Sequence, residues 1–362
     1  MTQINMMNAV NYKYSVVIKK TLSKIPHPPK ADTIILNHNY QRHLRSIFFL
    51  FILTFCWFLT QSQTELIEIE NFGSNPGNLI FYIHTPKIKK EKMPLVIALH
   101  GCNQDVATIS KQSGWNKLAD EYGFYILYPQ QRFLNNPSSC FNWFNEKDIS
   151  KNSGESGSIK QMIDFVCDSF SIDTSKIFAY GLSAGAAMTA ALLADYPNVF
   201  NAGAILAGGP FMMATNALSA MSIMVSPKFK SSKEWGELVL KQNPDYKNKY
   251  PRVIIIHGKN DVVVNIKNSY ELVKQWAYVL HTDTVPKKKT EDFANNKDVE
   301  KKVYLDKNKE TKIIFYEING LGHALPVDPG DGIGKGGHTG LFAVDKDFFS
   351  TYWVAKDFGL IK

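Results

Sequence analysis

The stretch "AYGLSAGAAM" (residues 179–188) places a serine between two glycines, at the point where an apolar run gives way to a helical one. Residues 177–180 predict a short buried strand, because apolar and aromatic side chains follow one another without a break. The residues after Ser183 are rich in Ala, Leu and Met and predict a helix that ends near Pro197. Ser183 is therefore expected on a strand-to-helix turn, at a helix N-terminus where developing negative charge is stabilised.

Further apolar runs predict that strands and helices alternate along the chain. Strands are expected at residues 77–86, 93–101, 124–129, 177–181, 202–210, 251–261 and 311–320, and helices at residues 114–123, 157–170, 265–280 and 346–360. This alternation predicts an α/β fold with a mostly parallel central sheet and helices on both faces. The pattern G-x-S-x-G around Ser183 is, in this context, typical of an α/β-hydrolase, and we expect that fold class. The alternative is a tight turn that happens to hold a serine.

Two stretches break the alternation. Residues 211–250 hold an apolar portion followed by a polar one rich in Lys and Ser. In an α/β-hydrolase such an insertion often covers the site as a cap, and the alternative is a surface pair of helices without a role in substrate binding. Residues 282–311 are dense in charge, and we expect them to form a solvated excursion before the last strand.

The N-terminal segment differs in composition from the rest of the chain. Residues 1–60 hold seven lysines and arginines against the single Asp32, which is a net charge of +6 out of +8 for all 362 residues. The positive charge therefore does not indicate a nucleic-acid-binding domain, and we expect no nucleic-acid partner. The apolar run at residues 47–59 is short for a bilayer span but suits the core of a signal peptide.

These features predict two parts and an exported protein. Residues 1–64 are expected to form a basic segment with a signal peptide or, if it stays uncleaved, a signal anchor at a membrane. Residues 65–362 are expected to form a single catalytic domain. The predicted localisation is secreted or extracytoplasmic.

A serine nucleophile needs a histidine base and a carboxylate that orients the base, and in α/β-hydrolases these follow the serine in the order acid, then histidine. Asp261 follows a predicted strand, at the sheet edge where active-site groups of parallel sheets gather. The alternative for Asp261 is a turn or helix-capping role. His323 lies in a Gly-rich loop beyond the last predicted strand, and His338 is its competitor. His100 and His257 are expected to pack or to form hydrogen bonds near the loops rather than to act as bases.

The oxygen that becomes negative when a serine attacks a carbonyl group needs two backbone N–H donors. We expect one donor from Ala184, directly after the serine, and one from Cys102, in the loop "LHGCNQ" (residues 99–104) after a predicted strand. Gln104 and Leu182 are expected to border the substrate pocket. No Cys-x-x-Cys or Cys/His cluster indicates a metal site, and this chemistry calls for no cofactor.

Six blocks of sequence together resemble a known family. They are "LHGCNQ", "ADEYGFYILYPQQ", "CFNWFN", "GLSAGAAM", "HGKNDVVV" and "GLGHA", and they occur in the order seen in the secreted esterase and poly(3-hydroxybutyrate) depolymerase family, which includes feruloyl and acetylxylan esterases. The resemblance covers roughly residues 75–355. It implies an α/β-hydrolase with Ser183 as nucleophile, Asp261 as orienting carboxylate and His323 as base.

The same resemblance has implications for the cysteines and for substrate binding. It implies a disulfide between Cys102 and Cys140, with Trp143 beside the acyl or aryl pocket; two free thiols are the alternative, and Cys167 is left over. The sequence departs from the family after His323, where "GHALPVDPG" lacks a tryptophan that many members have. Substrate contacts on that side are therefore not implied.

The leading prediction is a secreted serine carboxylesterase that acts on short polyester, feruloyl or acetyl esters. Its partner would be an ester substrate carried by a polyester or a plant cell-wall polysaccharide. One alternative is a serine peptidase on the same fold. Another is a noncatalytic binding protein that kept the fold.

Overall fold

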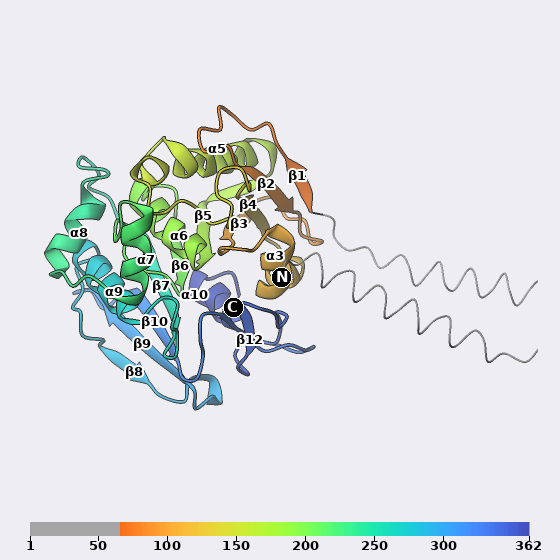
Figure 1. Ribbon diagram of the computed structural model, residues 1–362. Coiled ribbons are helices and arrows are strands. Elements are labelled where there is room, and N and C mark those ends of the chain that lie inside the picture. Colours follow the sequence, from red (N-terminus) through yellow and green to blue (C-terminus); the bar gives the residue numbers. More distant parts are fainter. Residues whose placement is uncertain (1–65, 362) are drawn as a thin grey trace, which may run out of the picture. The chain divides into compact units, whose positions relative to one another are not determined.

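A mixed sheet of ten strands runs through the computed structural model, which describes residues 66–361 (Figure 1). The strands are β1 (Ile67–Ile69), β2 (Ile80–His84), β3 (Met93–Leu99), β4 (Tyr125–Gln130), β5 (Ile172–Leu182), β6 (Ala202–Leu206), β7 (Arg252–Gly258), β8 (Lys288–Thr290), β9 (Val299–Leu305) and β10 (Thr311–Ile318). Their order in the sheet is β1-β2-β4-β3-β5-β6-β7-β10-β9-β8. The six strands from β4 to β10 in that order are parallel, whereas β1 and β2 at one edge and β9 and β8 at the other are antiparallel.

Each parallel strand sends alternate side chains to the two faces of the sheet, where helices cover them. In β3, Leu95, Ile97 and Leu99 join one hydrophobic cluster, while Val96 and Ala98 join the other. The first cluster includes side chains of α5 (Gly154–Ser169), α6 (Ala184–Asp195), α8 (Ser232–Leu240) and α9 (Lys267–Val279). The second includes side chains of α3 (Val106–Ser113), α4 (Trp115–Tyr122) and α10 (Ser350–Phe358). The predicted parallel sheet with helices on both faces is therefore confirmed.

The charged segment before the last central strand is largely exposed, but it is not an excursion away from the sheet, and that part of the expectation is wrong. It contains β8 and β9, which extend the sheet beyond β10. Opposite charges pair across these strands, since Lys302 of β9 pairs with Glu317 of β10, and Lys289 of β8 lies 2.7 Å from Glu300 of β9. Pairing between strands explains how so many charges fit in a sheet edge, and it is not visible in the local sequence.

The insertion after β6 holds two helices, α7 (Ala217–Val225) and α8. The indole N–H of Trp235 in α8 donates to the carboxylate of Glu271 in α9 at 2.8 Å, which fixes α8 against the domain. The end of α7 is bound to the loop between β7 and α9, where the backbone N–H of Asn265 donates to the carbonyl of Met224 at 2.8 Å. Both helices are therefore attached to the structure that follows β7.

Smaller elements complete the described part of the chain. They are the 3₁₀ helices η1 (Glu146–Ile149) and η2 (Phe293–Asn295) and the two-stranded sheet of β11 (Leu325–Val327) and β12 (Ala343–Asp345). Among residues 66–361 we find no helix with the length and apolar character that a bilayer crossing requires. The predicted signal peptide or anchor at residues 1–64 lies outside the described residues, as does the start of the proposed catalytic domain at residue 65.

Candidate active site

Ser183 lies on the turn between β5 and α6, as the strand and helix patterns predicted. Its backbone has φ 56° and ψ −117°, a region that non-glycine residues rarely adopt and that stores strain. The turn is held by the Ser183 N–H, which donates to the carbonyl of Leu206 in β6 at 2.9 Å. Gly185 lets α6 approach β3, because a Cβ at this position would lie 2.5 Å from the carbonyl oxygens of Leu99 and His100.

Three side chains from three loops form a continuous chain of hydrogen bonds. Nε2 of His323 lies 2.8 Å from Oγ of Ser183, and Nδ1 of the same ring lies 2.7 Å from Oδ2 of Asp261. Since a carboxylate only accepts, Nδ1 carries the proton, which leaves Nε2 of the neutral ring free to accept the serine hydroxyl. This arrangement can take a proton from Ser183 and can stabilise the imidazolium that results.

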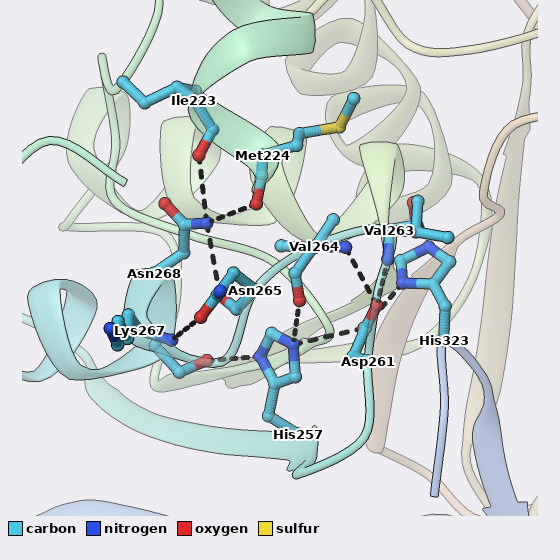
Figure 2. A network of polar contacts seen from close by, with 12 residues as sticks. Ile223, Met224, His257, Asp261, Val263, Val264, Asn265, Lys267, Asn268 and His323 are labelled. Atoms are coloured by element: carbon cyan, nitrogen blue, oxygen red, sulfur yellow. Dashed lines mark hydrogen bonds and ion pairs between the residues drawn. The ribbon is translucent and has the colours of Figure 1, made fainter. Parts of the chain in front are cut away.

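Asp261 is fixed by donors on both of its carboxylate oxygens (Figure 2). Oδ1 accepts the backbone N–H groups of Val263 and Val264 at 2.9 and 2.8 Å, and Oδ2 faces ring nitrogens of His323 and His257. Burial alone would raise the pKa of Asp261, but hydrogen bonds from the two histidines outweigh it and lower the pKa well below the usual range. The carboxylate therefore stays charged where an ordinary aspartate begins to protonate.

The loops that carry Asp261 and His323 are bound to each other. The backbone N–H of Asn260 donates to the carbonyl of Leu321 at 3.0 Å, and Oδ1 of Asn260 accepts the N–H of Gly320 at the same distance. Gly258 permits this approach, because a side chain there would collide with the carbonyl oxygen of Leu321. Contacts between the loops thus set the distance between the acid and the base.

A third loop, after β3, lies against the serine. A Cβ built on Gly101 would be 3.4 Å from Cβ of Ser183, so the backbone of this loop reaches the turn. Within residues 66–361, no oxygen accepts a hydrogen bond from the backbone N–H of Cys102 or of Ala184, the two donors that the sequence predicted. The neighbouring Cys102 side chain forms a disulfide with Cys140, which is the pairing that the family resemblance implies.

Comparison with known proteins shows where this chain belongs. The family model described as esterase PHB depolymerase matches residues 79–285. The poly(3-hydroxyalkanoate) depolymerase C of Paucimonas lemoignei is 39% identical over 302 residues, which cover 83% of this chain and 72% of that protein. The chain belongs to the esterase PHB depolymerase family.

Two further similar proteins are also ester hydrolases. Feruloyl esterase B of Talaromyces funiculosus is 28% identical over 76% of this chain and 78% of its own length. The solved structure of the acetyl xylan esterase from Aspergillus awamori matches with a TM-score of 0.66 and 25% identity, covering 72% of this chain and 94% of that one. The fold is that of an α/β-hydrolase, and the chain is a carboxylic ester hydrolase.

Gln104 and Leu182, which were predicted to border the substrate pocket, are both buried. Both ends of the buried Gln104 amide are used, since Oε1 accepts the Gly101 N–H at 2.8 Å and Nε2 donates to Oε1 of Gln112 at 2.9 Å. The Leu182 side chain is 1% exposed and lies in the hydrophobic cluster beneath α3, α4 and α10. Gln104 therefore holds the loop that contains Gly101, and Leu182 packs in the core.

Trp143, which the resemblance implies beside the acyl pocket, is buried, and His338, the competitor for the base, is bound to α3. Trp143 is 7% exposed and packs edge to face against Phe144, with ring centroids 5.6 Å apart. His338 is exposed, and its Nδ1 donates to the carbonyl of Lys111 at 3.1 Å. Of the two histidines that the sequence left in competition, the structure brings His323 to Ser183.

Sequence reasoning missed two groups that support the site. Buried Glu155 accepts hydrogen bonds from the backbone and side chain of Asn142, both at 2.8 Å, and so holds the segment that follows Cys140. Phe342 packs edge to face against the His323 ring, with centroids 6.5 Å apart. Neither position carries a local motif, so only the contacts between distant segments identify them.

Proposed function

We propose that this esterase cleaves its substrate through a covalent acyl-enzyme, with Ser183 as nucleophile, His323 as general base and Asp261 as the orienting carboxylate. The observation that carries the proposal is the hydrogen-bonded chain from Oγ of Ser183 through both nitrogens of His323 to Asp261. The strained backbone of Ser183 supports it, because strain of this kind persists where the surrounding structure holds a residue for a function.

The reaction then follows from the proton positions. Oγ of Ser183 attacks the ester carbonyl carbon while Nε2 of His323 takes the hydroxyl proton. When the tetrahedral intermediate collapses, His323 returns the proton to the leaving alcohol and the acyl group stays on Ser183. A water molecule, deprotonated by His323, attacks the acyl carbon and releases the acid with Ser183 restored.

The backbone N–H groups of Cys102 and Ala184 are proposed to hold the carbonyl oxygen as it becomes negative. Ala184 is the first residue of α6, so its N–H has no partner inside the helix. The Cys102 N–H belongs to the loop that lies against Ser183 and that Gln104 and the disulfide hold in place. Donors that are already aimed stabilise the developing charge without reorganisation.

Exposed apolar side chains favour a hydrophobic ester as substrate. The chain has no charged residue or histidine from residue 196 to residue 227, and α7 in this stretch exposes Leu218, Met221 and Val225 at helical spacing. Val262, next to Asp261, is 85% exposed. A surface of this kind beside the acid loop suits the apolar part of an ester substrate, such as a polyester chain.

The same proposal extends to the rest of the chain. Residues 65–362 would form the catalytic domain and residues 1–64 would direct export. The Cys102–Cys140 disulfide supports an oxidising compartment, because disulfides form and persist there. Trp143 is proposed to lie near the acyl pocket, as the family resemblance implies.

A substrate panel tests the function. Wild type, Ser183→Ala and a control, Ser175→Ala at an exposed position near the start of β5, would be assayed on p-nitrophenyl esters, hydroxybutyrate oligomers, methyl ferulate, acetylated xylan and peptide anilides. We expect ester hydrolysis by wild type and control, with kcat of Ser183→Ala lower by several orders of magnitude and its fluorophosphonate labelling lost. Preferential cleavage of peptide anilides would indicate a peptidase, and no turnover of any substrate would indicate a binding protein.

A further inference from the structure

A second histidine contacts the carboxylate of Asp261. His257, near the end of β7, is 1% exposed, and its Nε2 lies 3.2 Å from Oδ2 of Asp261 and 2.8 Å from the carbonyl oxygen of Val264. Its Nδ1 lies 2.6 Å from Oγ of Ser269 in α9. Figure 2 shows the His257 ring on the opposite side of Asp261 from His323.

The partners of His257 decide which of its nitrogens carries the proton. The carbonyl of Val264 can only accept, so Nε2 carries a hydrogen and shares it between Val264 and Asp261. Ser269 then donates its hydroxyl hydrogen to Nδ1 of the neutral ring. His257 is therefore a donor toward Asp261, and Ser269 holds it in that tautomer.

We propose that His257 is a positioning residue for ester hydrolysis, which holds the carboxylate of Asp261 in the orientation that the His323 ring requires. With His257 in place, Oδ2 receives N–H groups from two histidines and Oδ1 receives two backbone N–H groups. Rotation of the carboxylate would break several of these bonds at once. The inference rests on the proposed function, because it assigns a role through Asp261 in that reaction.

The support for His257 extends into the insertion after β6. Asn268, which is 1% exposed, donates through Nδ2 to the carbonyls of Ile223 and Met224 at the end of α7, at 3.2 and 3.0 Å. Asn268 precedes Ser269 in α9, so this contact fixes the turn that carries the partner of His257. The end of α7 thus holds the start of α9, and with it Ser269, in place next to His257.

The electrostatic consequence can be measured. The titratable groups that act on Asp261 are His257 of β7 and His323 of the loop after β10. The helices α7 and α9 contribute only carbonyl, amide and hydroxyl groups to the hydrogen bonds around His257. Removing the His257 donor raises the pKa of Asp261 and leaves its carboxylate a stronger acceptor for the His323 N–H. Because a carboxylate with fewer donors interacts more strongly with a positively charged ring, we expect the acid limb of the pH profile of kcat/KM to move to higher pH.

The test compares four variants of the full-length protein on p-nitrophenyl butyrate. His257→Leu removes the donor, His257→Gln restores an N–H near Nε2, and Ser269→Ala removes the group that holds the tautomer. His84→Leu is the matched control, because His84 is another buried histidine with a carboxylate partner, 3.0 Å from Asp120, but on β2. For each we would measure kcat, KM, the pH dependence of kcat/KM and the melting temperature.

We expect His257→Leu to lower kcat about 10-fold to 100-fold with little change in KM, as a misplaced catalytic group does. The acid limb of its pH profile of kcat/KM should move to higher pH. His257→Gln should recover most of both properties, and Ser269→Ala should change them in the same direction by a smaller amount. His84→Leu should lower the melting temperature while kcat and the acid limb stay at their wild-type values.

Several outcomes would overturn the inference. The first is that the His257→Leu variant folds and keeps the wild-type kcat and the wild-type acid limb. The second is that His84→Leu changes kcat and the acid limb as much as His257→Leu does. If His257→Leu does not fold, Ser269→Ala decides, and wild-type kcat and acid limb in that variant contradict the role of His257. Inactive Ser183→Ala with active wild type keeps the proposed function intact in each case, whereas inactive wild type would contradict the proposed function itself.

Discussion

His323 and Ser183 are 140 residues apart in the chain, yet Nε2 of the histidine lies 2.8 Å from Oγ of the serine. The contact depends on two loops at the carboxyl ends of β5 and β10 in one sheet. His338, only fifteen residues after His323, instead binds the carbonyl of Lys111 on α3. The tertiary structure thus separates two histidines that lie close together in the sequence.

This difference predicts opposite effects of two alanine substitutions. His323→Ala should lower kcat by several orders of magnitude, because no other group would accept the Ser183 proton. His338→Ala should retain most of the wild-type kcat and serves as the control. Steady-state kinetics on a soluble ester measures both. Strong loss in His338→Ala with activity retained in His323→Ala would place the base in the later loop.

The disulfide predicts a coupled loss of stability and rate in Cys140→Ser. Its cysteines are 38 residues apart, for which the chain-entropy model gives roughly 3–4 kcal/mol of stabilisation. The bond also holds the loop of the proposed Cys102 donor, so kcat should fall by a larger factor than KM rises. Complete loss of one such donor lowers kcat by about 10²–10³-fold, which is the largest decrease that we expect. Thermal unfolding and kinetics measure the two effects.

Cys167→Ser is the matched control for the disulfide, because Cys167 is a free, half-buried cysteine. It should leave kcat unchanged and alter the melting temperature little. A peptide map of the exported protein without reductant should show the Cys102–Cys140 link. Fully active protein with both cysteines as thiols would contradict this role.

Gln104→Leu should loosen the loop after β3. The substitution leaves the Gly101 N–H without its acceptor in a buried place, a loss of about 1–3 kcal/mol in the free energy of unfolding. We expect kcat to fall with little change in KM, since the loop carries the proposed Cys102 donor, whereas both ends of the Gln104 amide are bound within the protein. Gln112→Leu retains the Gln104–Gly101 bond, and it should keep a kcat closer to wild type. Equal kcat in both variants and wild type would refute the role of Gln104.

Two buried carboxyl groups predict that the folded state loses stability as pH rises. Burial, with the nearby Asp148 charge, raises the pKa of Glu155 to about 8, and burial raises the pKa of Asp195 to about 8. The unfolded chain releases these protons at much lower pH. The two groups therefore make their full contribution to the free energy of unfolding below about pH 4, and this contribution falls as the pH rises to about 8. His100, whose pKa burial lowers to about 4, acts in the opposite direction, but only below about pH 6.5.

The window between about pH 6.5 and pH 8 therefore isolates the carboxyl groups. There the free energy of unfolding should fall by about 1.4 kcal/mol per pH unit for each group. Asp195→Asn should remove about half of this slope in denaturant titrations, while Asp168→Asn, at an exposed position, should leave it unchanged. A free energy of unfolding that is flat across this window would contradict the assignment.

Much of the fold was predictable from the sequence, and for a local reason. The strands β5, β7 and β10 each contain a continuous apolar run. Ser183 follows β5 directly, and Asp261 and His323 lie in the loops that follow β7 and β10, so the order of strands and loops places all three at one edge of a parallel sheet. The helix α3 was missed because its eight residues mix polar and apolar side chains. The strands β8 and β9 were missed because their lysines and glutamates resemble a solvated loop until partners from β10 are known.

The sequence by itself determined the strand-to-helix turn at Ser183 and the order of serine, aspartate and histidine, because both depend on residues that are neighbours in the chain. Only the tertiary structure decided that His323 rather than His338 reaches Ser183, that Leu182 packs in the core, and that His257 contacts Asp261. These contacts depend on which loops lie next to each other at the sheet edge and on which hydrogen-bond partners lie near each histidine ring. Such distances are set by packing between segments far apart in sequence, and no local pattern of residues encodes them.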